Sequence, residues 1–148
     1  PMISHPGEIA EARRVFAREL ADLGKVPARM PELGIMVEVP AVAVTVERFA
    51  AADFFSIGSN DLVQYTLAAS RDAGGRVARL ADACDPAVLR LIGNVVAFGR
   101  ETGKEVSVCG DMASDGAGLA ALLDLGIRRV SVARAALGRV KVAIGRHG

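Results

Sequence analysis

The chain has 148 residues, 51% of them hydrophobic, and its 18 basic and 17 acidic side chains give a formal net charge of +1. This balance excludes the strong basic footprint of a nucleic-acid or anionic-membrane binder, and an aromatic content of 4% without Trp argues against base stacking. With no apolar run near 18 residues, no leading signal segment and only two cysteines, we expect one cytoplasmic domain with a substantial core and neither nucleic acid nor membrane as partner.

Helix and strand signals alternate along the first half of the chain. Apolar residues at helical spacing mark the helices, and glycine or proline marks where several elements begin or end. In chain order we predict the tail of a strand at Pro1–Ile3, a helix from about Gly7 to Leu23 closed by Gly24, a strand over Gly34–Glu38, a helix beginning at Pro40, a strand over Asp53–Ile57 and a short helix over Asn60–Ala69.

The alternation continues in the second half. Residues 70–84 are polar and contain Gly74-Gly75, which indicates a loop, and Asp85-Pro86 then supplies an N-cap followed by proline at the first helical position. The remaining predicted elements are a helix from Pro86 to Gly103, a strand over Glu105–Cys109, a helix over Gly116–Leu125, a strand over Arg129–Val132 and a helix over Ala135–Ile144.

This order is a repeated βα unit, which predicts an α/β fold with a parallel sheet and right-handed crossovers. A complete (β/α)₈ TIM-type barrel takes about 250 residues. We therefore expect residues 1–148 to form a single domain that is the C-terminal half of such a barrel, with about four to five parallel strands and their helices. The N-terminal barrel strands are then absent from the chain, and a half barrel has two open sheet edges.

Two predicted strands have a carboxylate at or just beyond their ends: Glu38 is the last residue of the first, and Asp61 comes shortly after the second. The carboxyl ends of parallel strands meet at one edge of a sheet, and two converging carboxylates are suitable ligands for a hard divalent cation. Alternatively, each acid only stabilises the N-terminus of the helix that follows it, with Asn60 as a cap. The presence of two acids at neighbouring strand ends favours the metal site.

Three further features at strand ends allow substrate chemistry. The turn over residues 58–61 presents backbone N–H groups at a helix start, as phosphate-binding turns do, and Arg71 could supply a forked cation. Cys109 lies at the end of a strand beside Gly110, where a proton-transfer role is possible. From composition alone, a solvated Arg71 and an inert, small Cys109 remain the simpler interpretations.

Five stretches of the chain carry a family resemblance. They are Gly34-Ile-Met-Val-Glu-Val-Pro40, Asp53-Phe-Phe-Ser-Ile-Gly-Ser-Asn-Asp-Leu-Val-Gln-Tyr-Thr-Leu-Ala68, Ser70-Arg71-Asp72, Pro86–Ile92 and Val108-Cys-Gly-Asp-Met-Ala113. With them the sequence resembles the C-terminal, phosphoenolpyruvate (PEP)-binding domain of enzyme I of the sugar phosphotransferase system. That family of PEP-protein phosphotransferases shares its barrel with pyruvate phosphate dikinase and PEP synthase, and Gln64-Tyr65-Thr66 favours enzyme I among them.

The resemblance implies a role for each candidate site residue. Glu38 and Asp61 would hold Mg²⁺, Asn60 and Asp61 would contact PEP, and Arg71 would bind the phosphate side of the substrate. Cys109 would be the acid that protonates the methylene carbon as the enolate becomes pyruvate. Mg²⁺ and arginine would stabilise charge on the phosphoryl group and on the enolate.

The resemblance also implies parts that the chain lacks. The histidine that accepts the phosphoryl group would lie on a separate N-terminal domain, and further arginines would come from earlier barrel strands, so the chain alone is expected to be inactive in phosphoryl transfer. A phosphocarrier protein (HPr or a homologue) and homodimerisation are the implied partnerships. The chain departs from the family at Ser59, usually Thr, and at Asp111, usually Glu.

Two other classes of function stay open. Mg²⁺-dependent aldolases and lyases that act on pyruvate-type substrates also use a Glu and an Asp at barrel strand ends, but they give Cys109 no predicted role. A non-catalytic regulatory half-barrel is also compatible with Asp111 and with the short chain.

Overall fold

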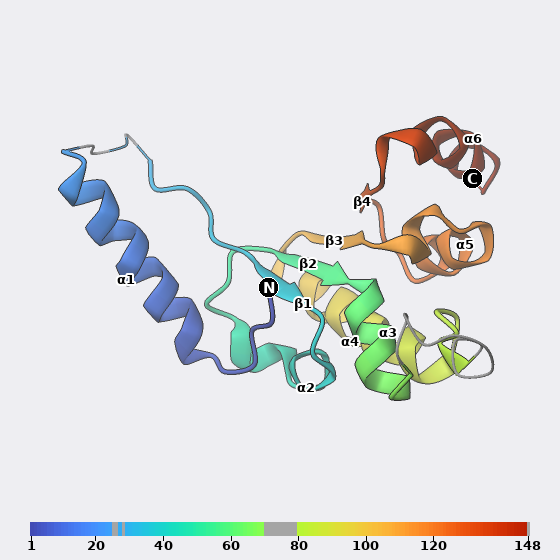
Figure 1. Ribbon diagram of the computed structural model, residues 1–148, viewed down its shortest axis with the longest axis horizontal. Coiled ribbons are helices and arrows are strands. Elements are labelled where there is room, and N and C mark those ends of the chain that lie inside the picture. The colour runs from blue at the N-terminus through green and yellow to red at the C-terminus, as the bar shows by residue number, and fades with distance from the viewer. Residues whose placement is uncertain (25–26, 28, 70–79, 148) are drawn as a thin grey trace.

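The computed structural model describes residues 1–24, 27, 29–69 and 80–147, and four parallel strands form its centre (Figure 1). The helices, 3₁₀ helices and strands are α1 (Gly7–Asp22), β1 (Ile35–Val37), α2 (Pro40–Val44), η1 (Val46–Phe49), β2 (Phe55–Gly58), α3 (Ser59–Leu67), α4 (Pro86–Thr102), β3 (Val106–Cys109), η3 (Asp111–Ser114), α5 (Gly116–Asp124), β4 (Val130–Ser131), η4 (Arg134–Ala136) and α6 (Leu137–His147). None of the helices among these residues is long and apolar enough to cross a membrane.

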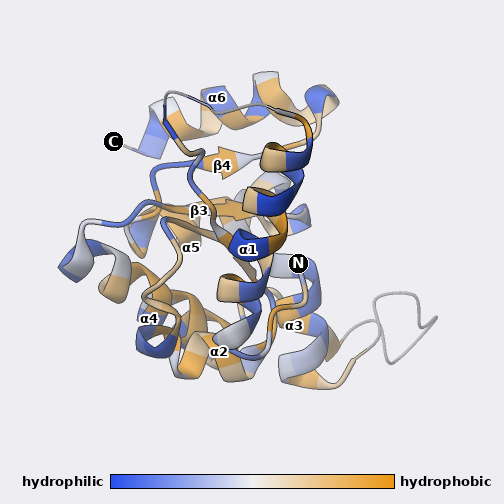
Figure 2. Cartoon of the chain, turned by 90° about the vertical axis from the view of Figure 1, so that its left-hand side faces the viewer, coloured by the Kyte–Doolittle hydropathy of each residue, from blue (hydrophilic) through white to orange (hydrophobic). Residues whose placement is uncertain are grey.

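The strands lie in the order β1-β2-β3-β4, all parallel, so each strand pairs with the next one along the chain. A doubly wound sheet would reverse its strand order at a switch point, whereas a barrel keeps neighbouring strands consecutive. The helices that come after β1 are arranged along the sheet in the order of the strands, with α2 and α4 at one end and α6 at the other (Figures 1 and 2). The predicted α/β fold with the architecture of a partial (β/α) barrel is thus confirmed.

The core lies between the sheet and the helices that cross over it. Alternate strand residues form two buried rows, Ile35–Phe55–Val106 and Val37–Ile57–Val108, in which all but Val106 are fully or almost fully buried. Helix α4 covers β2 and β3, and the ring of Phe98 meets Phe55 edge to face at 5.9 Å between centroids. The apolar stripe of α4 predicted from its spacing is buried at every position: Val88, Leu91, Ile92, Val95 and Val96.

The capping residues and glycines predicted to mark helix ends do so in the structure. The Asp85 side chain accepts a hydrogen bond from the backbone N–H of Ala87 at 2.8 Å and caps α4, whose first residue is Pro86. Gly24 and Gly103 follow helices with φ of +61° and +69°, the left-handed conformation that favours glycine. The start and end of these helices are therefore encoded by single residues.

Two predictions about the first half of the chain are wrong in detail. The helix predicted from Pro40 is not continuous but divides into α2 and η1 at Thr45, which has φ −121° and ψ +41° and whose hydroxyl donates to the Ala41 carbonyl. Residues Pro1–Ile3 form no strand. Met2 has φ +55°, outside the extended region, and its N–H donates to the Glu38 side chain and not to a neighbouring strand.

Helix α1 is confirmed, but its predicted apolar face is largely uncovered. Ile9 is buried, whereas Phe16 is 41% and Leu23 70% exposed. The described sheet has no strand beyond β1 for this face to pack on. Both the edge of β1 and the outer face of α1 are therefore open in this structure.

Asp53 links α1, the segment before β1 and the segment before β2. Its Oδ2 accepts hydrogen bonds from the backbone N–H of Leu33 at 2.6 Å and from the Arg13 guanidinium at 2.8 Å, and Arg13 also donates to the Ala51 carbonyl. The Leu33 N–H, and after it Arg13, hold the pKa of the Asp53 carboxyl below its ordinary value of 3.8. The contacts favour the ionised form.

Replacing Asp53 with asparagine is expected to lower the free energy of unfolding at pH 7 by about 1–2 kcal/mol, the value of charged hydrogen bonds reduced for partial exposure. Because the folded-state pKa is lowered, this stabilisation is present above pH 3.8 and is lost as the pH falls from there through the lowered pKa. Urea unfolding at pH 7 and pH 3 measures it. Asp22→Asn, at an exposed acid of α1, is the control, and equal stability of the two variants would contradict the prediction.

Candidate active site

The candidate site is a row of residues at the carboxyl ends of the strands. Gly58 pairs with Cys109, and Cys109 pairs with Ser131. Glu38 directly follows Val37, the partner of Ile57, and so joins the same row beside Gly58. Side chains alternate along a strand, so Glu38 and Cys109 share the sheet face opposite to the buried core rows. In a barrel this face is the interior.

Glu38 is the most deeply buried acid described, with 3% of its surface exposed. Its Oε1 accepts a hydrogen bond from the backbone N–H of Met2 at 2.5 Å. Its Oε2 lies over Gly58, where an added Cβ would stand only 2.8 Å from this oxygen. Gly58 therefore leaves room for the carboxylate above the end of β2. A buried carboxylate with one described hydrogen-bond partner is costly unless a cation or a ligand compensates it.

Asp61 lies in the first turn of α3, three residues beyond Gly58, and is half-buried. The fold thus brings Glu38 to the start of the helix that carries Asp61. Both acids offer hard oxygen donors, and Mg²⁺ in enzymes commonly uses one or two carboxylates and completes its shell with water and substrate phosphates. In the described part of the chain no group of three or more His, Cys, Asp or Glu gathers, and the two-carboxylate set fits Mg²⁺ without one.

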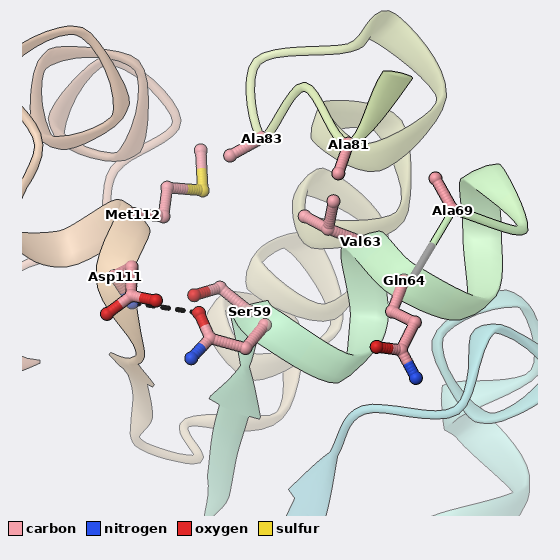
Figure 3. Close-up of a pocket in the computed structure, with 9 residues that line it drawn as sticks. Ser59, Val63, Gln64, Ala69, Ala81, Ala83, Asp111 and Met112 are labelled. Atoms are coloured by element: carbon pink, nitrogen blue, oxygen red, sulfur yellow. Dashed lines mark hydrogen bonds between the residues drawn. The ribbon is translucent and has the colours of Figure 1, made fainter. Parts of the chain in front are cut away.

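The ends of β2 and β3 are joined by side chains from the first turn of α3. The Ser59 hydroxyl donates to the Cys109 carbonyl at 2.8 Å, and the Asn60 Oδ1 accepts from the Asp111 N–H at 2.9 Å (dashed line in Figure 3). Gly110 lies between these two bonds with φ +106°. A side chain there would also meet the Ser59 Oγ, because an added Cβ would lie 2.3 Å from it.

Cys109 is half-buried, and its thiol Sγ donates to the Ile57 carbonyl at 3.6 Å, a weak hydrogen bond. This contact places the thiol against the end of β2, on the same sheet face as Glu38.

A cavity of about 140 Å³ adjoins this junction, between α3, η3 and residues 81–83 (Figure 3). Ser59 and Asp111 lie on one side of it, with Met112 beside Asp111, and Gln64 lies on the other side beside Ala69 (Figure 3). The lining residues are Ser59, Asn60, Val63, Gln64, Ala69, Ala81, Ala83, Asp111 and Met112. Arg71, the predicted phosphate ligand, lies outside the described residues.

Sequence reasoning placed Glu38, Asn60, Asp61 and Cys109 at one edge of the sheet, and the structure has them there. It missed Ser59 as a link to Cys109 and Met2 as a partner of Glu38. The signal for the first was Gly110, since a glycine directly after a strand-end cysteine indicates close approach of a neighbouring segment.

Comparison with known proteins gives consistent results over nearly the whole chain. The family described as PEP-utilising enzyme, PEP-binding domain, matches residues 1–147. A PEP synthase of Pyrococcus furiosus is 44% identical over 133 residues, and PEP-protein phosphotransferases of Geobacillus stearothermophilus and Bacillus subtilis are 43% and 42% identical over 136 residues. These alignments cover 88–89% of the chain but only 16–24% of the relatives, so the chain spans less than a quarter of their length.

Proposed function

This chain belongs to the family of PEP-binding domains of PEP-utilising enzymes, and we propose that it binds Mg²⁺-PEP at the carboxyl edge of its sheet. The observation that carries the proposal is Glu38, a buried carboxylate held over Gly58 at the start of the helix that bears Asp61. These two acids would hold Mg²⁺. When bound, the ion would neutralise charge on the phosphate and enolate oxygens.

Asn60 and Arg71 would bind the substrate. The Asn60 Oδ1 is engaged by the Asp111 N–H, so the amide would present its N–H groups to an anionic oxygen of PEP. Arg71 would contribute a forked pair of donors to the phosphate. Asp61 would contact the substrate through its backbone as well as holding the ion.

Cys109 would complete the reaction. Cleavage of the bond between phosphorus and the bridging oxygen transfers the phosphoryl group to a histidine and leaves the enolate of pyruvate. The Cys109 S–H then gives its proton to the methylene carbon, which yields pyruvate and a thiolate that water reprotonates. The proton that the thiol now shares with the Ile57 carbonyl is the one transferred.

The rest of the enzyme would come from outside these residues. The open edge of β1 and the exposed face of α1 fit a domain completed by preceding barrel strands, and a separate domain would carry the histidine. An enzyme I activity would add a phosphocarrier protein as partner, a homodimer and a cytoplasmic location. Identity of 44% to a PEP synthase equally supports that second activity, in which the same half site would serve the formation of PEP.

Isothermal titration of PEP into the 148-residue chain tests the proposal. We expect PEP binding that requires Mg²⁺ and disappears on chelation with EDTA, because the two carboxylates repel an anionic substrate without the cation. The control titrates pyruvate under the same conditions and should bind far more weakly, since it lacks the phosphate. Binding of PEP that is indifferent to Mg²⁺ would contradict the proposal.

A further inference from the structure

We propose that Ser59 and Asn60 are positioning residues that fix the proton donor Cys109 against strand β2. The proposal rests on the proposed function for the role of Cys109, and it adds two groups that act through that residue. The first turn of α3 holds the Cys109 carbonyl and the Asp111 N–H, with Gly110 enclosed between them.

The Ser59 hydroxyl is aimed away from its own helix. Ser59 is the first residue of α3, and the N-cap position belongs to Gly58, which provides no side-chain cap. The hydroxyl is buried, with 1% of the residue exposed, and donates instead to the Cys109 carbonyl at 2.8 Å, 50 residues away in the chain. A serine hydroxyl at a helix start ordinarily forms its hydrogen bond within its own helix, as a cap. The Ser59 hydroxyl instead connects the ends of two strands, which indicates a role at this junction.

Cys109 is consequently tied to β2 at two points. Its carbonyl accepts from Ser59, directly after β2, and its thiol donates to the Ile57 carbonyl within β2. β2 also carries Gly58, over which the Glu38 carboxylate lies. The strand pairing of Cys109 with Gly58 places its backbone, and the Ser59 and thiol bonds are the two further contacts that set the position of the thiol relative to the carboxylate.

Asn60 and Gly110 make the turn selective for one conformation. The Asp111 N–H is held by Asn60 at 2.9 Å, and Gly110 has φ +106°, which other residues rarely adopt. An added Cβ at Gly110 would lie 2.3 Å from the Ser59 Oγ and 2.8 Å from the Asn60 Oδ1. All three residues of the turn are thus fixed by contacts with two consecutive residues of α3.

The test compares Ser59→Thr with Ser59→Val. Threonine and valine have the same shape, and only threonine keeps the hydroxyl. In the 148-residue chain, alkylation of Cys109 by iodoacetamide is followed by mass spectrometry from pH 6 to pH 10. We expect Ser59→Val to raise the Cys109 rate about fivefold, the population change that corresponds to loss of a hydrogen bond of about 1 kcal/mol, and Ser59→Thr to stay within about twofold of the unchanged chain.

Cys84 is the internal reference. Its thiol is half-buried, and burial followed by the nearby Asp82 raises its pKa. General loosening of the Ser59→Val chain would accelerate both thiols, whereas loss of positioning accelerates Cys109 alone. Equal Cys109 rates in the two variants, or parallel acceleration of Cys84, would overturn the proposal.

If Ser59→Val does not fold, amide hydrogen exchange in the unchanged chain tests the proposal instead. The Asp111 N–H is expected to exchange at least about tenfold more slowly than the N–H of Gly116, because Asn60 accepts from the first and Gly116 starts α5 at an exposed position. Equal exchange would overturn the proposal. Neither readout involves substrate, so an unchanged chain that fails to bind Mg²⁺-PEP refutes the proposed function separately.

Discussion

Replacing Cys109 with alanine is expected to lower pyruvate formation from PEP by about 10²–10⁴-fold, the usual contribution of a general acid. Alanine removes the protonated thiol that now donates to the Ile57 carbonyl and leaves the carboxylates Glu38 and Asp61 in place. The enolate would still form, but its protonation would then depend on water and would be slow. Binding of Mg²⁺-PEP should therefore stay within a few-fold of that of the unchanged chain.

The measurement needs a histidine acceptor and a complete barrel. Under the proposed function, a chimera in which this chain replaces the matching region of the Bacillus subtilis phosphotransferase, 42% identical over 136 residues, would supply both. Cys84→Ala removes the other free thiol and is the matched control, with no change in rate expected. A Cys109→Ala chimera as fast as the unchanged chimera would remove Cys109 from the reaction. Under that result another acid or a water molecule would supply the proton to the enolate.

The sequence predicted the fold because its signals are local. Apolar runs too short for a helix marked each strand, and Asp85-Pro86 and Gly103 marked both ends of α4. Consecutive βα units then determined the order of the parallel strands. The division at Thr45 was missed because it depends on a balance between a hydroxyl-to-backbone bond and helix continuation, which apolar spacing does not report.

The candidate site was predicted less completely, for a physical reason. Alternation along strands is enough to place Glu38 and Cys109 at one edge and on one face. The bonds that orient them join residues distant in sequence, 36 residues from Met2 to Glu38 and 50 from Ser59 to Cys109. Such contacts depend on how closely two segments of the chain approach each other, and the periodicity of apolar residues does not encode that distance. Gly58 and Gly110 are the sequence signals for the close approach, because a side chain at either position would occupy the space of these contacts.

Replacing Glu38 with glutamine is expected to weaken Mg²⁺-dependent PEP binding by at least about 100-fold. Even residues one step removed from a metal change its affinity by about 10–100-fold, so loss of a charged ligand should exceed that range. Glutamine keeps the length of the side chain and an oxygen that can accept from the Met2 N–H. Asp61→Asn should act in the same direction. Calorimetric titration of PEP with and without Mg²⁺ measures both variants, with Glu47→Gln, an exposed acid of η1, as the control.

The stability of the same variant separates binding from structure. Glu38 is 3% exposed and has one described hydrogen-bond partner, and a buried charge with few partners is weak evidence for a stabilising role. Glu38→Gln keeps the shape of the side chain and is therefore expected to leave the free energy of unfolding unchanged or to raise it by about 1 kcal/mol. A structural glutamate would show the reverse, with lower stability and unchanged ligand binding. Lost binding together with unchanged or raised stability would mean that the chain keeps this carboxylate for the ligand and not for the fold.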